Sequence, residues 1–130
     1  MYTHVTHHIK VSVEPTFLED HSFPLEEHFV WAYRVWIENQ GHETVQLLSR
    51  TWRITNSKGV TQVVKGEGVV GEKPRILPGA VYHYASGTPL LTPSGIMEGL
   101  YHMKTKVGQN FDVIIPAFSL DSPYETQGIH

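Results

Sequence analysis

The sequence contains no cysteine, and this absence excludes several kinds of site. A chain without thiols has no disulfides, no thiolate zinc site and no cysteine nucleophile. The N-terminal stretch MYTHVTHHIK lacks the apolar core of a signal peptide. No apolar run approaches the roughly 18 residues of a membrane span. These absences predict a cytoplasmic protein that does not attach to a membrane.

A surplus of basic residues is also missing. The chain has 10 lysines and arginines against 13 aspartates and glutamates, which gives a net charge of −3 with histidine neutral. Proteins that bind nucleic acid without sequence preference carry excess positive charge, because neutralising phosphates supplies most of their affinity. We therefore expect no nucleic-acid partner.

Helical periodicity is nearly absent, whereas apolar and polar residues alternate along most of the chain. The clearest alternation spans residues 29–38, which are apolar on one face and largely apolar on the other, where Arg34 interrupts them, and so are typical of a central strand. In residues 45–55 the pattern places Leu48, Trp52 and Ile54 on the core face. The remaining strands are expected at residues 5–14, 60–65, 80–85, 97–107 and 111–118, with loops at 15–24, 66–79 and 86–95.

Seven or eight short strands separated by turn residues predict an all-β fold. We expect one domain over residues 1–130, an antiparallel β-sandwich of the fibronectin type III or immunoglobulin-like kind, with a small barrel as the alternative. No linker or internal repeat divides the chain. Residues 119–130 are expected to form a loosely ordered tail.

Several segments, in order along the chain, resemble the ApaG family over roughly residues 3–125. They are YRVWIENQG (33–41), LLSRTWRITNSKG (47–59), GEGVVGEKPRILPG (66–79), YHYASGTPLLTPSGIMEGLYHM (82–103) and FDVIIPAFSLD (111–121). The resemblance implies a fibronectin type III-like sandwich in a bacterial protein. It also implies a link to cobalt tolerance and magnesium efflux without an assigned site, and related eukaryotic domains act as protein-interaction modules. The family name reflects genomic proximity to a diadenosine tetraphosphate hydrolase, and this proximity does not assign an activity to the family.

The spacing Gly66-x-Gly68-x-x-Gly71 matches the dinucleotide-binding fingerprint. That mechanism requires a helix whose N-terminal amides hold the pyrophosphate, and the prolines at positions 74 and 78 exclude one here. Two interpretations remain. The glycines serve tight backbone turns, or their amides form an anion-binding nest. In the second case phosphate or nucleotide would bind at this loop, with help from the nearby cations Lys65, Lys73 and Arg75.

No motif in the sequence predicts catalysis or a metal centre. Neither a G-x-S-x-G nor an H-E-x-x-H segment occurs. Nine histidines are present, but His4 and His8 lie four residues apart, about 13 Å along a strand. We therefore expect no enzyme activity, no cofactor, no metal ligands and no catalytic residues.

The residues most suited to binding a partner are aromatic and basic. Arg34 and Trp36 share the less uniform face of the central strand, and such pairs are typical of binding hot spots. Loops 66–75 and 86–95 are further candidates. His102, Lys104 and Lys106 form a basic row on one strand face, which either protects the strand or meets an acidic partner. The sequence thus favours a non-enzymatic protein-binding module, with anion or nucleotide binding through residues 66–71 as the alternative.

Overall fold

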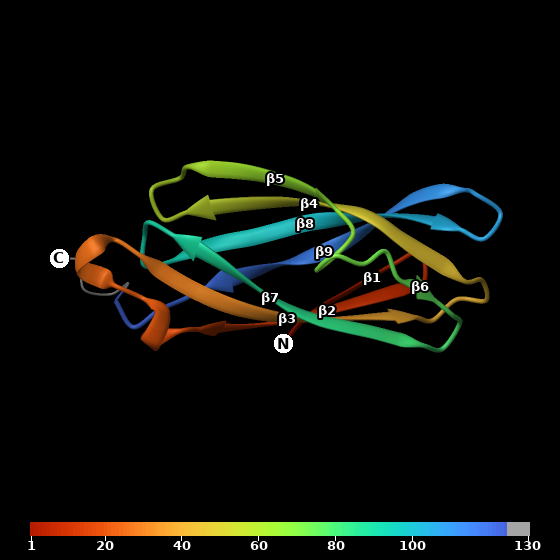
Figure 1. The fold of residues 1–130 in the computed structure, drawn as a ribbon, viewed down its shortest axis with the longest axis horizontal. Coiled ribbons are helices and arrows are strands. Elements are labelled where there is room, and N and C mark those ends of the chain that lie inside the picture. The colour runs from red at the N-terminus through yellow and green to blue at the C-terminus, as the bar shows by residue number, and fades with distance from the viewer. Residues whose placement is uncertain (125–130) are drawn as a thin grey trace.

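A computed structural model describes residues 1–124, which form two antiparallel sheets packed face to face (Figure 1). The first sheet has the strand order β1 (Tyr2–Thr6), β2 (Ile9–Phe17), β3 (Phe29–Asn39), β7 (Val81–Leu90). The second has the order β5 (Thr61–Glu67), β4 (Val45–Asn56), β8 (Gly95–Thr105), β9 (Asn110–Leu120), and β6 (Arg75–Ile76) also pairs with β4. The fold is therefore the predicted all-β sandwich, not a barrel.

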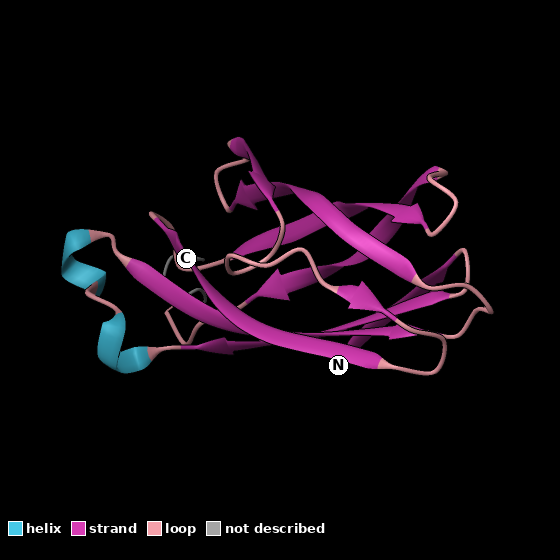
Figure 2. Cartoon of the chain, turned by 45° about the vertical axis from the view of Figure 1, so that its right-hand side comes forward, coloured by secondary structure: helices cyan, strands magenta, loops and turns pink. Residues whose placement is uncertain are grey.

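Among the described residues, helical structure is confined to two short 3₁₀ turns between β2 and β3 (Figure 2). These are η1 (Glu19–His21) and η2 (Pro24–Glu26). Within residues 1–124 no helix has the length and apolar character needed to cross a membrane.

The core forms because alternate residues of each strand point between the sheets. On β3 the five apolar residues of one face, Phe29 to Ile37, are all buried, as the alternation predicts. Tyr33 of the first sheet contacts Trp52 and Phe118 of the second, with ring centroids 5.5 and 6.0 Å apart. Aromatic contacts of this kind join the two layers at the centre of the sandwich.

The prediction of one continuous strand over residues 5–14 is wrong, because a hairpin turn divides it between β1 and β2, although the part that lies in β2 is a strand with the predicted buried face. His7 and His8 adopt positive φ angles of 48° and 64° and form the turn between β1 and β2. Two-residue hairpins require such backbone angles, but the residues that usually signal them are Asn and Gly. As a result Val5 pairs with Lys10 and is half exposed, away from the core.

Two prolines lie inside strands where loops were expected. Pro15 belongs to β2 and Pro89 to β7. The predicted loop 15–24 is therefore displaced to residues 18–28, and the predicted loop 86–95 is shorter than expected. Proline is tolerated because each position has a neighbouring strand on one side only. Pro15 lies beyond the start of β1, whose pairing with β2 begins at Val13, and Pro89 lies on the edge strand β7. The second loop is reduced to residues 91–94.

A bulge in β4 changes which leucine reaches the core. The pairing of β4 with β8 shifts between Leu47 and Ser49. Leu47 is therefore fully buried and Leu48 only partly, which reverses the sequence prediction. A bulge inserts one extra residue, so the core-facing positions are odd-numbered before it and even-numbered after it. Trp52 and Ile54 follow the bulge and are buried, as predicted.

The predicted tail over residues 119–130 begins too early. Residues 119 and 120 belong to β9, and Leu120 is fully buried. Tyr124 packs against Phe17 and Phe29, with ring centroids 6.1 and 6.0 Å apart. Residues 125–130, the rest of that prediction, lie outside the described residues.

Buried tyrosines between the sheets make the fold sensitive to alkali. The hydroxyls of Tyr84 and Tyr101 are hydrogen-bonded to each other, and burial raises the pKa of both above 10.0, the ordinary value for tyrosine. Burial also raises the pKa of Tyr33. The native state therefore holds these protons more tightly than the unfolded chain does. The resulting stability is fully present below about pH 10 and is lost as the pH rises toward the folded-state pKa values.

We accordingly expect the free energy of unfolding to fall between about pH 8 and about pH 11. Urea unfolding at both pH values measures this fall. The Tyr84→Phe variant has one fewer such group and should show a shallower fall. An equal fall in variant and wild type would contradict the assignment to this tyrosine.

Candidate functional site

The glycines of the 66–71 segment serve backbone geometry at two positions. Gly68 and Gly71 have φ angles of 59° and 82°, and a Cβ on Gly68 would lie 2.2 Å from the carbonyl oxygen of Glu72. Val70 also has a positive φ, of 43°, so the chain reverses in a two-residue turn between Val69 and Glu72. This matches the turn interpretation of the motif.

Amides of this segment are hydrogen-bonded within the protein. Gly68 N–H donates to the carbonyl of Leu48 at 2.8 Å, and the amides of Val69 and Glu72 donate to each other's carbonyls at 2.8 and 2.9 Å. These three donors are therefore engaged and do not converge on a common point. Anion binding at residues 66–71 remains a prediction, but it would have to use other donors.

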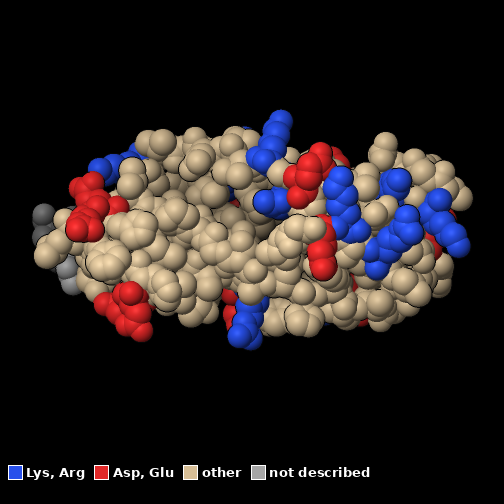
Figure 3. Space-filling model, viewed as in Figure 1, with Lys and Arg blue, Asp and Glu red and all other residues tan. Residues whose placement is uncertain are grey.

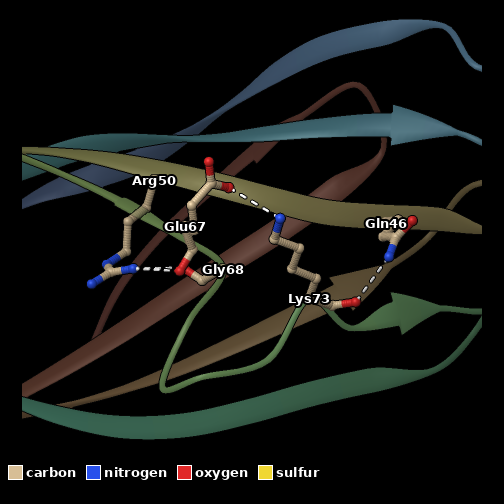
Figure 4. Close-up of polar contacts among 5 residues, drawn as sticks. All are labelled: Gln46, Arg50, Glu67, Gly68 and Lys73. Carbon is tan, nitrogen blue, oxygen red and sulfur yellow. Dashed lines mark hydrogen bonds and ion pairs between the residues drawn. The ribbon is translucent and has the colours of Figure 1, made fainter.

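Arg50 lies against the glycine segment, and the sequence analysis missed it. It faces Gly66 across the β4–β5 pair, and its Nη1 donates to the carbonyls of Gly68 at 2.7 Å and Glu67 at 3.2 Å (Figure 4). A Cβ on Gly66 would lie 2.8 Å from Nη1, so the missing side chain makes room for the guanidinium. The segment thus presents carbonyl oxygens to a cation here. Only the strand register places this arginine opposite that glycine.

The three predicted cations of the segment do not gather around the glycines. Lys65 is exposed on β5, and Lys73 Nζ forms an ion pair with Glu67 Oε2 at 3.2 Å (Figure 4). Arg75 lies on β6, where it joins Lys104 and Lys106 around a separate hollow. The structure therefore separates Arg75 from the other two cations of the predicted anion site.

We call this second feature the basic hollow. It has a volume of about 460 Å³ and no acidic residue in its lining, which consists of Thr44, Val45, Gln46, Arg75, Leu77, Lys104, Thr105 and Lys106. Basic side chains gather on the right half of the face in Figure 3. Arg75 comes from the predicted binding loop 66–75, and Lys104 and Lys106 come from the predicted basic row.

The third member of that row, His102, belongs to a different network. Its Nε2 is 2.8 Å from the Thr51 hydroxyl, and its Nδ1 is 2.8 Å from Asp112 Oδ1. This order of hydroxyl, imidazole and carboxylate is that of a hydrolase triad. However, the Asp112 side chain is 57% exposed on the outer face of a sheet, whereas triad carboxylates are buried and water is excluded from the reaction. The arrangement orients His102 and carries no prediction of catalysis.

Among residues 1–124 no group of three histidine, aspartate or glutamate side chains could hold a metal ion.

Arg34 and Trp36 lie on the outer face of the first sheet, as a hot-spot role requires. Arg34 is exposed, and Trp36 is half-buried between its cross-strand neighbours Ser12 and His83. Both line a shallow hollow of about 520 Å³ together with His83 and Ala85. The geometry suits a contact surface, and its use by a partner stays a prediction.

A further surface, which we call the apolar end, lies where the β4–β5 hairpin approaches the end of β7 (Figure 1). A hollow of about 350 Å³ opens there, lined by His28, Ile54, Asn56, Val60, Gln62, Pro89, Leu90 and Leu91. Leu91 is 69% exposed and Val60 is 62% exposed. Beside them Phe23, also exposed, stacks on His28 with ring centroids 6.2 Å apart.

Acidic residues border the apolar end. Glu19, Asp20, Glu26 and Glu27 are all exposed in and next to the two 3₁₀ turns. Figure 3 shows two groups of acidic side chains near the left end of the molecule, a basic side chain next to the upper group, and a largely uncharged surface beside them. Part of this surface belongs to the predicted binding loop 86–95. Phe23, His28 and Val60 were not predicted, because only the fold brings them to the same end.

Comparisons with known proteins identify the family. The model of the ApaG domain matches residues 19–105. Protein ApaG of Paramagnetospirillum magneticum is 58% identical over 125 residues, covering 96% of each chain, and Protein ApaG of Parvibaculum lavamentivorans is 53% identical over 130 residues, covering 100% of each. A crystal structure of a Bordetella pertussis protein described as ApaA superimposes with a TM-score of 0.86 at 42% identity, covering 88% of this chain and 94% of that one. The chain belongs to the ApaG domain family.

Proposed function

We propose that this domain is a non-enzymatic module that binds a protein partner at its apolar end. The observation that carries the proposal is the exposure of Leu91 and Val60 beside a hollow whose lining is mostly apolar. Exposed apolar residues scattered singly need no explanation, but a group of them around a cavity is typical of an interaction site. Fully burying a leucine or valine side chain under a partner contributes about 1.5–3 kcal/mol, so two such anchors supply a useful affinity.

The surroundings of the hollow indicate the chemistry of the partner. Four exposed acidic residues lie in or next to the 3₁₀ turns that flank it, namely Glu19, Asp20, Glu26 and Glu27. Complementary charge around an apolar contact accelerates association and selects among partners. We therefore propose a partner segment that inserts an apolar side chain and carries basic residues on either side of it.

A direct role in binding divalent cations is not part of this proposal, because no group of three metal-ligating side chains occurs within residues 1–124. The link to cobalt tolerance and magnesium efflux would then act through the bound partner.

Affinity capture with paired variants tests the proposal. We expect Val60→Glu combined with Leu91→Glu to lose the proteins that the wild-type domain enriches, because two carboxylates replace the apolar anchors. The matched control combines Val5→Glu with Val107→Glu, two exposed valines outside the lining of the hollow, and should keep them. Quantitative mass spectrometry measures the enrichment, and circular dichroism checks that both variants fold.

Two outcomes would contradict the proposal. The first is equal capture by both variant pairs. The second is a loss of partners on Trp36→Ala alone, which would place the contact on the outer face of the first sheet instead.

A further inference from the structure

We propose that the basic hollow binds a compact polyphosphate anion, and that this site is independent of the apolar end. Three cations line the hollow, namely Arg75 of β6 and, at the end of β8, Lys104 and Lys106. The inference goes beyond protein binding and moves the predicted anion site away from the glycines.

Strand pairing holds two of the cations at a defined separation. Gln46 of β4 pairs with Arg75 of β6 on one side and with Lys104 of β8 on the other. Two strand spacings put the backbones of Arg75 and Lys104 about 10 Å apart. Their long side chains can therefore reach one ligand between them. Lys106 follows the end of β8 and adds a third donor from the edge of the hollow.

No ion pair of the described residues holds the cations of the hollow. Within residues 1–124 the ion pairs are Arg53–Glu98, Lys73–Glu67 and His102–Asp112, and none includes a cation of the hollow. Three positive charges thus line one cavity in a chain whose net charge is −3. Cations held together without carboxylates attract anions, and the attraction grows with the charge of the anion.

Size and charge together favour polyphosphate over other anions. A volume of about 460 Å³ is in the range of small-molecule sites. One carboxylate would compensate a single cation and leave two unpaired, whereas a diphosphate or triphosphate can meet all three. The guanidinium of Arg75 can also bind two phosphate oxygens at once. The hydroxyls of Thr44 and Thr105 and the side-chain amide of Gln46 line the same cavity as polar groups.

Titration of the full chain with inorganic pyrophosphate, followed by NMR at low salt, tests the site. We expect saturable shifts of the amides in residues 44–47, 75–77 and 104–106. The Arg75→Gln, Lys104→Gln variant should bind about tenfold more weakly, because it loses two charged contacts. The matched control, Lys58→Gln with Lys65→Gln, removes the same charge elsewhere and should stay within about twofold of wild type.

The other outcomes would overturn the proposal. Shifts confined to residues 66–71 and lost in the control variant would return the anion to the glycine segment. Equal weakening in both variants would mean general charge attraction, and equal affinity for sulfate and pyrophosphate would exclude a preference for polyphosphate. Absence of saturation at about 10 mM pyrophosphate would mean that the hollow is not a ligand site, since the dissociation constant would then be weaker than millimolar, which corresponds to less than about 4 kcal/mol of binding free energy.

Discussion

Replacing Trp31 with alanine should lower the free energy of unfolding by about 3–5 kcal/mol. The indole is 1% exposed and packs edge-on against Phe17, with ring centroids 5.3 Å apart. Its Nε1 also donates a hydrogen bond to the carbonyl of Asp121 at 2.7 Å, which ties the end of the chain after β9 to the first sheet. The substitution opens a large cavity and removes this bond together. Since small domains are stable by about 5–15 kcal/mol, the loss is a large part of the total.

Two further variants separate these contributions. Trp31→Phe keeps most of the apolar contact but leaves the Asp121 carbonyl without its donor, and should cost less than the alanine variant. Trp36→Ala removes the same side chain from a half-buried position on the outer face, where no closed cavity forms. Urea unfolding measures all three. An equal loss at positions 31 and 36 would contradict the assignment of Trp31 to the core.

Replacing Asn39 with alanine should cost about 2–4 kcal/mol, a large effect for one small polar side chain. Asn39 is 1% exposed at the end of β3. Its Nδ2 donates to the carbonyls of Glu43 at 2.7 Å and Ile76 at 2.9 Å, and its Oδ1 accepts from the amide of Gly41 at 2.9 Å. The side chain therefore joins the β3–β4 turn to β6. Alanine leaves these three backbone groups without their partner, one of them in a fully buried bond.

A second asparagine provides the matched control. Asn56 accepts hydrogen bonds from the amides of Lys58 and Val60 in an exposed hairpin turn, where water can replace it. Asn56→Ala should therefore cost only about 1 kcal/mol. Asn39→Asp should be at least as harmful as Asn39→Ala, because a carboxylate would face two carbonyl oxygens. Thermal unfolding compares the three, and equal costs at positions 39 and 56 would contradict the role assigned to Asn39.

The turn residues show how far local sequence patterns reach. Asn39 lies in a stretch, Asn-Gln-Gly-His, that predicts a turn, and the chain does turn there. The pattern does not reveal that the side chain points inward and binds a strand 37 positions later. Conversely, the His7–His8 hairpin has no glycine or asparagine to signal it, so the sequence predicts one strand where there are two. Turn composition is a local property, but the partner of a buried polar group is not.

The alternation of apolar and polar residues was sufficient to predict the all-β sandwich and the buried face of β3, because side chains of a strand alternate strictly between its two faces. The family resemblance followed from the same sequence. Only the tertiary structure decided which surfaces form. The basic hollow joins residues 44–46 to residues 75–77 and 104–106, and the apolar end joins His28 to Val60 and Leu91. These groups depend on strand order and register, which long-range packing of the two sheets sets and which no local pattern encodes.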